Sequence, residues 1–214
     1  MGATGYAQRV PYSRTPALFG QVMGLVALTT GFATLGVYLF RHAGGAFWFI
    51  AWMVALGCLV GLNVANSRGN QQLALVLLFA FGLLLGASVA STVNYYAATD
   101  PTAVRQAFGA TALFVGGLGA TGYAIRKDLS FLYRFLFWAL LALILAGIAL
   151  IFVRIPAAYT AYAVVGLVIF GGYTVVDFNR LRRAGSEEAI PLAAGIFLDI
   201  LNIFLLFLRI FARN

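Results

Sequence analysis

The chain contains seven apolar runs of about 20 residues, and this repeated pattern most constrains how it can fold. A helix needs about 20 predominantly apolar residues to cross a hydrocarbon core of about 30 Å. Only 9% of the 214 residues are charged, whereas a soluble globular domain carries roughly a quarter. The sequence therefore excludes an ordinary soluble domain and a disordered chain. It predicts these membrane spans: Leu18–Phe40, Gly45–Ala65, Leu73–Ser91, Ala103–Ala124, Phe131–Val153, Ala157–Asp177 and Ala189–Phe211.

The connections between these runs are short, so we predict an all-α integral membrane protein with no inserted soluble domain. Residues 18–211 are expected to form a single domain of seven transmembrane helices. Residues 1–17 are polar, and no short apolar region with a small-residue cleavage site follows them. We therefore interpret the first span as retained, with residues 1–17 as a cytoplasmic N-terminal segment.

Lysine and arginine residues are unequally distributed between the two ends of the predicted spans. Cytoplasmic loops carry an excess of these residues, and eight lie on the N-terminal side against five on the other. This count predicts a cytoplasmic N-terminus. The formal net charge of +8 is scattered singly between apolar runs, which favours contacts with lipid headgroups and argues against nucleic acid. The eight are Arg9, Arg14, Arg68, Arg126, Lys127, Arg180, Arg182 and Arg183, and the five are Arg41, Arg105, Arg154, Arg209 and Arg213.

Three of the spans carry pairs of glycines spaced four residues apart. In lipid, small residues at this spacing let two helix backbones approach closely and pack by van der Waals contact. We therefore expect a compact helical bundle with packing contacts at Gly20/Gly24, Gly57/Gly61 and Gly82/Gly86.

The sequence offers little material for enzymatic chemistry. A single cysteine, Cys58, excludes an intramolecular disulfide and a cysteine-based metal cluster, and a single histidine, His42, excludes a histidine-rich site. No Gly-rich phosphate loop, HExxH helix or Ser/His/Asp set is present. We expect the protein not to be an enzyme and to hold no resident cofactor.

Two acidic residues, Asp177 and Asp199, fall inside predicted spans. An ionisable group within the bilayer costs several kcal/mol, so such groups are functional candidates by default. The remaining acids lie at predicted connections, where charges are solvated; they are Asp100, Asp128, Glu187 and Glu188.

Spacing along the chain places these two aspartates at similar depth. The sixth and seventh spans are expected to be antiparallel neighbours, and the midpoint between positions 177 and 199 is Glu188, at the turn. Each aspartate is then about 11 residues, or about 16 Å, from the apex of the turn. If the two side chains share a face, they can meet.

Two carboxyl groups in contact in a low-dielectric site share one proton, which makes the pair a pH sensor. Loss of that proton leaves two negative charges that either repel each other or recruit a cation. Ca²⁺ is the best-matched cation, and Asn202, three residues after Asp199, is placed to add an oxygen or amide ligand. In the alternative interpretation, each aspartate pairs separately with Arg180, Arg68 or Arg209 and simply locks helices together.

The sequence around these aspartates resembles the C-terminal signature of the transmembrane Bax inhibitor motif family. The resemblance is carried by Gly172–Leu181 (Gly-Tyr-Thr-Val-Val-Asp-Phe-Asn-Arg-Leu), Ala189–Leu192 (Ala-Ile-Pro-Leu) and Leu198–Leu205 (Leu-Asp-Ile-Leu-Asn-Ile-Phe-Leu). Ala107–Thr111 and Arg126–Ser130 add further support. The motifs cover about the last half of the chain, and the first two spans match only in hydropathy.

This resemblance implies a seven-helix bundle in which the last helix is central and surrounded by the other six. It also implies a pH-sensitive Ca²⁺ leak in which the aspartates matching Asp177 and Asp199 close the pore when protonated together and open it when the shared proton is lost. Bacterial members carry an arginine at the end of the second span that bonds the aspartate of the sixth. The nearest candidate here is Arg68, although Asn66 is closer to the expected position. The short loops are typical of a bacterial member, which implies the inner membrane.

Three functions remain as hypotheses. The first is a pH-gated calcium leak channel whose gate, pH sensor and ion ligands are Asp177 and Asp199. The second is a non-conducting regulator that binds a membrane-protein partner such as a membrane protease. The third is a proton-coupled transporter that uses the same pair as its proton site. The expected partners are calcium ions, protons and the bilayer, and the expected state is a monomer or weak oligomer.

Overall fold

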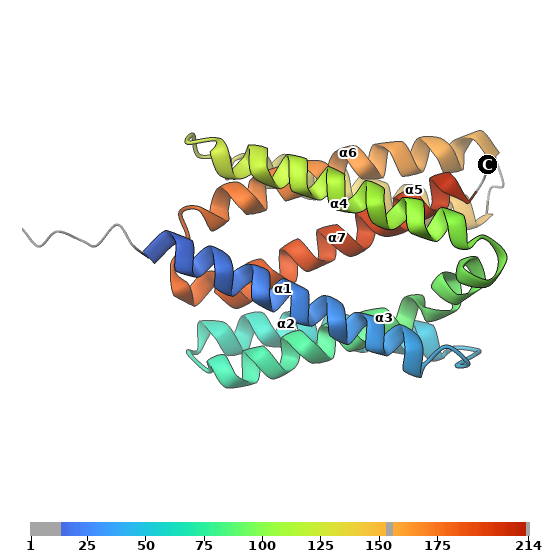
Figure 1. Cartoon of the computed structure of the whole chain (residues 1–214), viewed down its shortest axis with the longest axis horizontal. Coiled ribbons are helices and arrows are strands. Elements are labelled where there is room, and N and C mark those ends of the chain that lie inside the picture. Colours follow the sequence, from blue (N-terminus) through green and yellow to red (C-terminus); the bar gives the residue numbers. More distant parts are fainter. Residues whose placement is uncertain (1–13, 153–155, 213–214) are drawn as a thin grey trace, which may run out of the picture.

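The computed structural model describes residues 14–152 and 156–212, and these residues form seven long helices joined by short connections (Figure 1). All seven are long and apolar enough to cross a membrane, which confirms the predicted series of spans. Helix α1 begins before the predicted boundary at residue 18, and most of the proposed N-terminal segment lies outside the described residues. The helices are α1 (Arg14–Leu39), α2 (Phe47–Ser67), α3 (Gln71–Thr99), α4 (Pro101–Ala124), α5 (Leu132–Phe152), α6 (Pro156–Leu181) and α7 (Ala189–Phe211), with a short 3₁₀ helix, η1 (Ser186–Glu188), before α7.

Local chemistry at the connections explains where several helices begin and end. The Asn70 carboxamide oxygen accepts a hydrogen bond from the Leu73 amide at 3.1 Å and caps the start of α3. Asp100 is the only residue between α3 and α4, and its carboxylate accepts from the Ala103 amide at 3.0 Å. Pro101 then occupies the first position of α4, where its missing amide hydrogen costs nothing. Asp100 is therefore an interfacial cap, in agreement with its predicted place in a connection.

Helix α3 continues eight residues beyond the predicted end of its span at Ser91. The additional turns are polar, but Asn94 and Thr99 donate side-chain hydrogen bonds to backbone carbonyls of their own helix, at 2.8 and 2.9 Å. With 29 residues, α3 is about 43 Å long and exceeds a hydrocarbon core of about 30 Å. Its C-terminal end therefore extends into the interfacial region.

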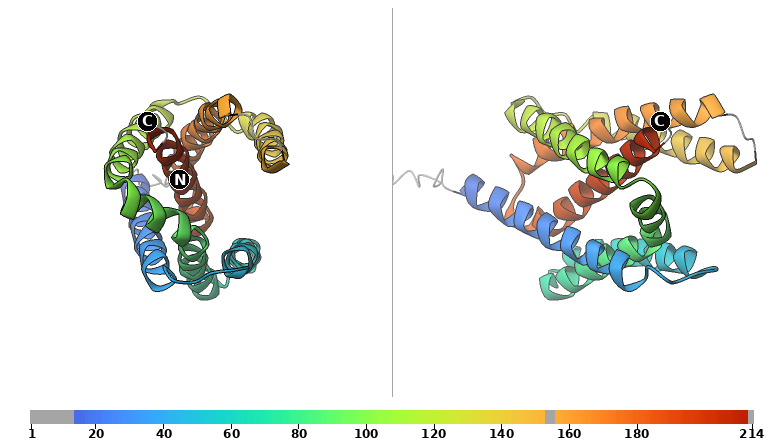
Figure 2. Two further views of the ribbon diagram at one scale, coloured as in Figure 1. Left: turned by 90° about the vertical axis from the view of Figure 1, so that its right-hand side faces the viewer. Right: turned by 45° about the vertical axis from the view of Figure 1, so that its right-hand side comes forward.

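Helix α7 lies between two groups of helices, α1–α3 and α4–α6 (Figure 2). It packs against α6, α4 and α1, and also contacts α2 and α3, whereas α5 packs mainly against α6. Helices α6 and α7 are the most deeply buried spans and α5 is the least buried. The central position implied for the last helix is confirmed, with α5 at the outside of the surrounding set.

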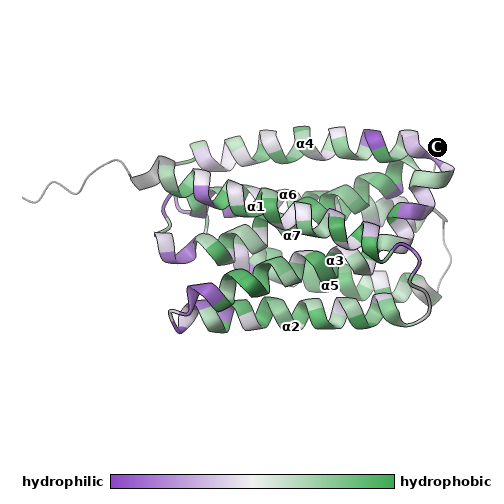
Figure 3. Cartoon of the chain, turned by 60° about the horizontal axis from the view of Figure 1, so that its bottom comes forward, coloured by the Kyte–Doolittle hydropathy of each residue, from purple (hydrophilic) through white to green (hydrophobic). Residues whose placement is uncertain are grey.

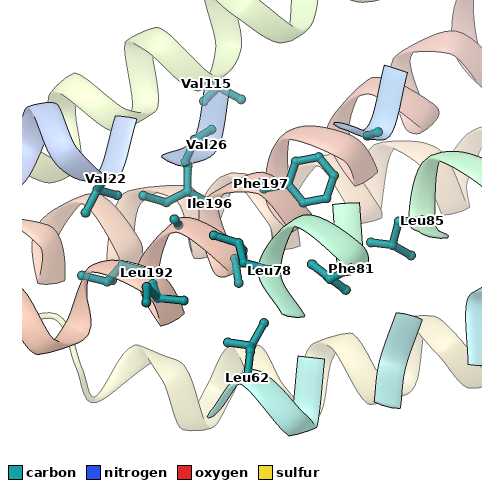
Figure 4. Packing of buried hydrophobic residues seen from close by; sticks show 14 of the residues in the cluster. Val22, Val26, Leu62, Leu78, Phe81, Leu85, Val115, Leu192, Ile196 and Phe197 are labelled. Carbon is teal, nitrogen blue, oxygen red and sulfur yellow. The ribbon is translucent and has the colours of Figure 1, made fainter. Parts of the chain in front are cut away.

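The centre of the bundle is filled by apolar side chains from both groups (Figure 4). Phe81 of α3 and Phe197 of α7 meet edge to face, with ring centroids 5.9 Å apart. Leu62 and Leu78, from α2 and α3, are completely buried beside them. Side chains packed in this way fix α7 relative to the first three helices, because vacant space or overlap is costly at a packed contact.

One of the three glycine pairs makes the close helix contact expected of it. A methyl group at Gly86 would collide with the Ala33 carbonyl of α1, and one at Gly82 would lie 2.7 Å from the Thr29 carbonyl oxygen. Gly61 faces only the side chain of Leu77, with the nearest atom 3.2 Å away. The expectation is wrong for the remaining three, since nothing lies within 4 Å of a methyl group built at Gly20, Gly24 or Gly57. Glycine spacing alone does not reveal which face of a helix meets a neighbour.

Polar residues gather at the two ends of the bundle and leave an apolar belt between them (Figure 3). The start of α1 and the connections α2–α3, α4–α5 and α6–α7 share one end. This end carries the basic residues that were assigned to the N-terminal side, as far as they are described; they are Arg14, Arg68, Arg126, Lys127, Arg180, Arg182 and Arg183. Arg9, Arg154 and Arg213 lie outside the described residues. A cytoplasmic location for this end stays a prediction.

Replacing Gly86 with alanine is expected to weaken the bundle, because the added methyl group forces α1 away from α3. Overpacking of this kind costs typically about 1–3 kcal/mol. The measurement is the thermal unfolding midpoint of the purified protein in detergent. Gly57→Ala is the matched control, since the same methyl group enters open space there. Equal midpoints for the two variants would contradict the assigned α1–α3 contact.

Candidate functional site

Asp177 and Asp199 are both buried at the contact between α6 and α7, with 5% of each residue exposed. These are the two most buried helices, so the carboxyl groups lie inside the bundle and away from the lipid-facing surface. The apolar residues around them make α6 and α7 membrane helices. The packing of these neighbours therefore holds the two acids inside the bundle. Their burial removes water from the carboxyl groups, which costs free energy.

The carboxyl group of Asp177 contacts two other helices. Its Oδ1 accepts a hydrogen bond from the hydroxyl of Tyr133, in the first turn of α5. Its Oδ2 lies against Gly195 of α7, where a Cβ atom would be only 2.7 Å away. The absence of a side chain at Gly195 leaves the space that this carboxyl oxygen occupies.

The carboxyl group of Asp199 has a weaker set of partners. Thr174 Oγ1 of α6 lies 3.5 Å from Asp199 Oδ2, at the long limit for a hydrogen bond. The same hydroxyl donates to the Phe170 carbonyl at 2.9 Å. A hydroxyl has one hydrogen, so the shorter bond uses it and leaves an oxygen lone pair towards Asp199.

The two aspartates lie on neighbouring turns rather than at equal depth. Asp177 faces Gly195, and Asp199 faces Thr174, so the pair is displaced by three to four residues, or about 5 Å, along the helices. The prediction of similar depth assumed a turn centred on Glu188. In the structure α6 ends at Leu181 and α7 begins only after η1, so the connection is not symmetric about that residue. With a displacement of about one turn, both carboxyl groups still lie buried at the same α6–α7 contact.

Neither aspartate is part of an ion pair among the described residues, which argues against the interpretation of a simple helix lock. Arg180 points its guanidinium to Glu188, with Nε 2.8 Å from Oε2, and is partly exposed. Arg209 lies over the rings of Tyr159 and Tyr162 at 5.3 and 5.5 Å from their centroids, in the last turn of α7. The arginines proposed as partners are therefore engaged elsewhere or exposed.

The structure does not bring Arg68 or Asn202 to the aspartates. Arg68 is an exposed residue at the C-terminal end of α2. Asn66, which is nearer to the position expected for the family's arginine, donates instead to the Glu187 carbonyl at 2.9 Å. Asn202 donates to the Leu198 carbonyl of its own helix at 2.8 Å. The Asn66 hydrogen bond thus joins the end of α2 to the α6–α7 connection.

Asn179, two residues after Asp177, anchors the α4–α5 connection to α6. The residue is 1% exposed, and its amide nitrogen donates to the carbonyls of Gly122, Ile125 and Lys127 at 3.3, 2.7 and 3.1 Å. Its oxygen accepts from the Leu129 amide at 3.2 Å. One buried side chain therefore contacts four backbone groups at the end of α4 and in the following connection, and its two N–H hydrogens are shared among the three carbonyls.

A surface ion pair joins the same two segments. Arg183 Nη1 lies 2.8 Å from Asp128 Oδ2, and its Nη2 donates to the Asn179 side-chain oxygen at 2.8 Å. The hydrogen bond from Arg183 holds the pKa of the Asp128 carboxyl well below its usual range. Asp128 is thus a solvated charge with a local partner, as predicted for the acids in connections.

Together these contacts form a site that can hold and release a proton. It contains two carboxyl groups, one phenol and one hydroxyl, all from helices α5, α6 and α7. Among the described residues there is no cluster of three or more histidine, cysteine, aspartate or glutamate side chains that would hold a metal ion.

Sequence reasoning found the two aspartates but missed Tyr133, Thr174, Gly195 and Asn179. Thr174 and Asn179 lie within the motif that carried the family resemblance, so closer attention to its polar positions would have raised them. Tyr133 and Gly195 have no comparable signal. A tyrosine at the end of a span is ordinary in a membrane helix, and a glycine next to a carboxyl group is visible only once the helices are placed.

Comparison with known proteins gives one family. A family model described as inhibitor of apoptosis-promoting Bax1 matches residues 16–214. An uncharacterized membrane protein of Vibrio cholerae is 34% identical over 137 residues, which cover 63% of this chain and 61% of that protein. An uncharacterized protein of Deinococcus radiodurans is 34% identical over 187 residues, or 75% of this chain and 81% of that protein. Inner membrane protein YbhL of Escherichia coli is 26% identical over 170 residues, or 74% and 71% of the two chains.

The contact between Gly195 and the Asp177 carboxyl is testable with a double-mutant cycle. Gly195→Ala is expected to lower the unfolding midpoint, because its methyl group displaces Asp177 Oδ2. In an Asp177→Ala background the carboxyl group is absent and the new methyl group fits. The loss in free energy of unfolding caused by Gly195→Ala should therefore be smaller there, by about 1 kcal/mol or more. Equal costs of Gly195→Ala in the two backgrounds, measured by thermal or denaturant unfolding in detergent, would show that the two residues are not in contact.

Proposed function

The chain belongs to the Bax1-inhibitor family of membrane proteins, and on that premise we propose that it is a pH-sensitive calcium leak channel. In this proposal Asp177 and Asp199 form the gate and the proton sensor. The name of its Escherichia coli relative supports a place in a bacterial inner membrane, and the unequal distribution of basic residues supports a cytoplasmic N-terminus.

The observation that carries the proposal is the burial of two carboxyl groups on neighbouring turns of the two most buried helices, where no basic side chain among the described residues forms an ion pair with either. Ionising both groups in a low-dielectric interior places two unscreened negative charges close together. One shared proton removes most of that repulsion. The protonation state of the pair therefore determines how closely α6 and α7 can pack.

The expected direction of the pH response follows from this charge balance. At low pH the pair retains its proton, and the helices pack closely, as in the described structure with both carboxyls almost fully buried. At higher pH the proton is lost, and the two charges separate the helices or attract a cation. Cation flux should therefore increase as pH rises.

Calcium is the proposed cargo because paired carboxylates are typical ligands of this hard, oxygen-seeking ion. Hydroxyl oxygen from Thr174 adds to the carboxylates along the α6–α7 contact. Conduction requires that binding be strong enough for entry and weak enough for exit, which an incomplete ligand set favours. No resident cofactor and no enzymatic step are needed in this mechanism.

The prediction concerns calcium flux into proteoliposomes that contain the purified protein. Wild-type flux should rise with pH, by about tenfold per pH unit at most in the steep part of a single-proton transition. Asp177→Asn and Asp199→Asn should each flatten this pH dependence, because a carboxamide cannot share or lose the proton. The measurement is the rate of entry, reported by a calcium-sensitive dye over a series of pH values.

Glu187→Gln is the matched control, since it changes an exposed carboxyl group in the α6–α7 connection at the same end of the bundle. It should leave both the flux and its pH dependence near the wild-type values. Unchanged flux in both Asp177→Asn and Asp199→Asn would rule out the gate. Absence of flux in the wild type, with co-purification of a membrane protein, would instead favour the non-conducting regulator. Saturable, proton-coupled uptake of a solute would favour the transporter.

A further inference from the structure

Tyr133 makes a contact that its position in the fold does not lead one to expect. Helix α5 is the least buried span and packs mainly on α6, yet its first turn places a phenol hydroxyl on the Asp177 carboxyl. The ring lies beside Tyr173 of α6, with centroids 5.9 Å apart. Through Tyr133 the outer helix α5 thus contacts the buried acid pair at Asp177.

The chain just before Tyr133 is fixed by Asn179. That side chain bonds four backbone groups between Gly122 and Leu129, and Arg183 adds its ion pair with Asp128. Asn179 and Asp177 are two residues apart on the same helix, so the helix that carries the acid also holds the segment that carries its donor. The phenol is therefore presented to Asp177 by a short, well-bonded connection.

The hydrogen-bond partners of the two acids are unequal, and this inequality places the shared proton. Asp177 accepts from a phenol, which favours its ionised form. Asp199 faces the Thr174 hydroxyl, whose hydrogen is already donated to the Phe170 carbonyl. A protonated Asp199 can donate to the Thr174 oxygen, whereas an ionised Asp199 finds only a lone pair there.

We propose that Tyr133 is a positioning residue of the acid pair: held by the Asn179-anchored connection, it keeps Asp177 ionised and leaves the shared proton on Asp199. This assignment rests on the proposed role of the pair as a proton sensor. It gives the two aspartates different tasks, with Asp199 as the group that releases the proton and Asp177 as the fixed negative charge.

Other groups also act on the pair and must be kept constant in a test. On α6, Arg180 lies three residues after Asp177, and Tyr173 is the neighbour of Thr174, the residue that faces Asp199. From α7, Asp199 lies one turn away from Gly195, the residue that faces Asp177, and Gly195 itself has no side chain. Where α4 packs on α6 it presents Gly119 and Gly122, which carry no charge. Replacing Tyr133 with phenylalanine leaves all of these groups in place.

The test uses infrared difference spectroscopy of the full-length protein in lipid, which follows the carbonyl band of protonated carboxyl groups as pH changes. In an Asp199→Asn background only Asp177 of the pair titrates. There, Tyr133→Phe should raise the titration midpoint by about one pH unit or more, since a hydrogen bond to the charged group is lost. In an Asp177→Asn background only Asp199 titrates, and Tyr133→Phe should leave its midpoint unchanged.

The same spectra locate the proton directly. At neutral pH the protonated-carboxyl band should disappear in Asp199→Asn and persist in Asp177→Asn. The reverse pattern, or equal shifts by Tyr133→Phe in both backgrounds, would overturn the assignment. Tyr123→Phe is the matched control, because it removes a phenol hydroxyl from α4, where the ring packs against Phe19 and not against the acids. It should move neither midpoint.

Asn179→Ala tests the anchoring step, and correct folding is checked by elution as a single species. It should shift the Asp177 midpoint in the same direction as Tyr133→Phe, and an unchanged midpoint would show that the anchored connection does not position the phenol. Since none of these measurements uses calcium flux, a protein that conducts nothing can still show the predicted titration. Gated flux with no effect of Tyr133→Phe on either midpoint would overturn only the role of Tyr133.

Discussion

The proposed function depends on the repulsion between two carboxyl groups that are buried at the α6–α7 contact and form no ion pair with any described residue. Transfer of a charge from water into the interior of a membrane bundle costs several kcal/mol, and a second like charge nearby adds to it. A shared proton is the simplest way to lower that cost. In the proposed mechanism the packing of α6 on α7 depends on the protonation of Asp177 and Asp199, so a change of pH would change the helix packing.

The remaining helices determine how this repulsion is expressed. Helices α1 and α3 form a tight pair at Gly82 and Gly86, and Phe81 and Phe197 attach this pair to α7. On the other side Asn179 ties the α4–α5 connection to α6. The acid pair thus lies between two well-packed bodies, which is the arrangement in which a local charge change can move one body relative to the other.

The length of the apolar runs made the seven spans predictable, and it also singled out Asp177 and Asp199 as acids within spans. Both predictions depend only on the cost of placing polar groups in lipid. The contacts of those acids were not predictable. Their depth depended on an asymmetric connection, and the expected arginine contacts were absent because Arg180 meets Glu188. Which glycines pack depended on helix rotation, so Gly86 met the expectation and Gly20 did not. Spacing gives distance along one helix, whereas these features are set by how neighbouring helices are placed and rotated.

The most direct test of the central claim is a pair of high-resolution structures in lipid, one at acidic and one at alkaline pH. At acidic pH we expect the carboxyl oxygens of Asp177 and Asp199 to approach within hydrogen-bond distance, about 3 Å or less. At alkaline pH we expect them to separate, with α6 displaced from α7 or a cation between the two groups. An identical carboxyl geometry and helix packing at both pH values would contradict the account.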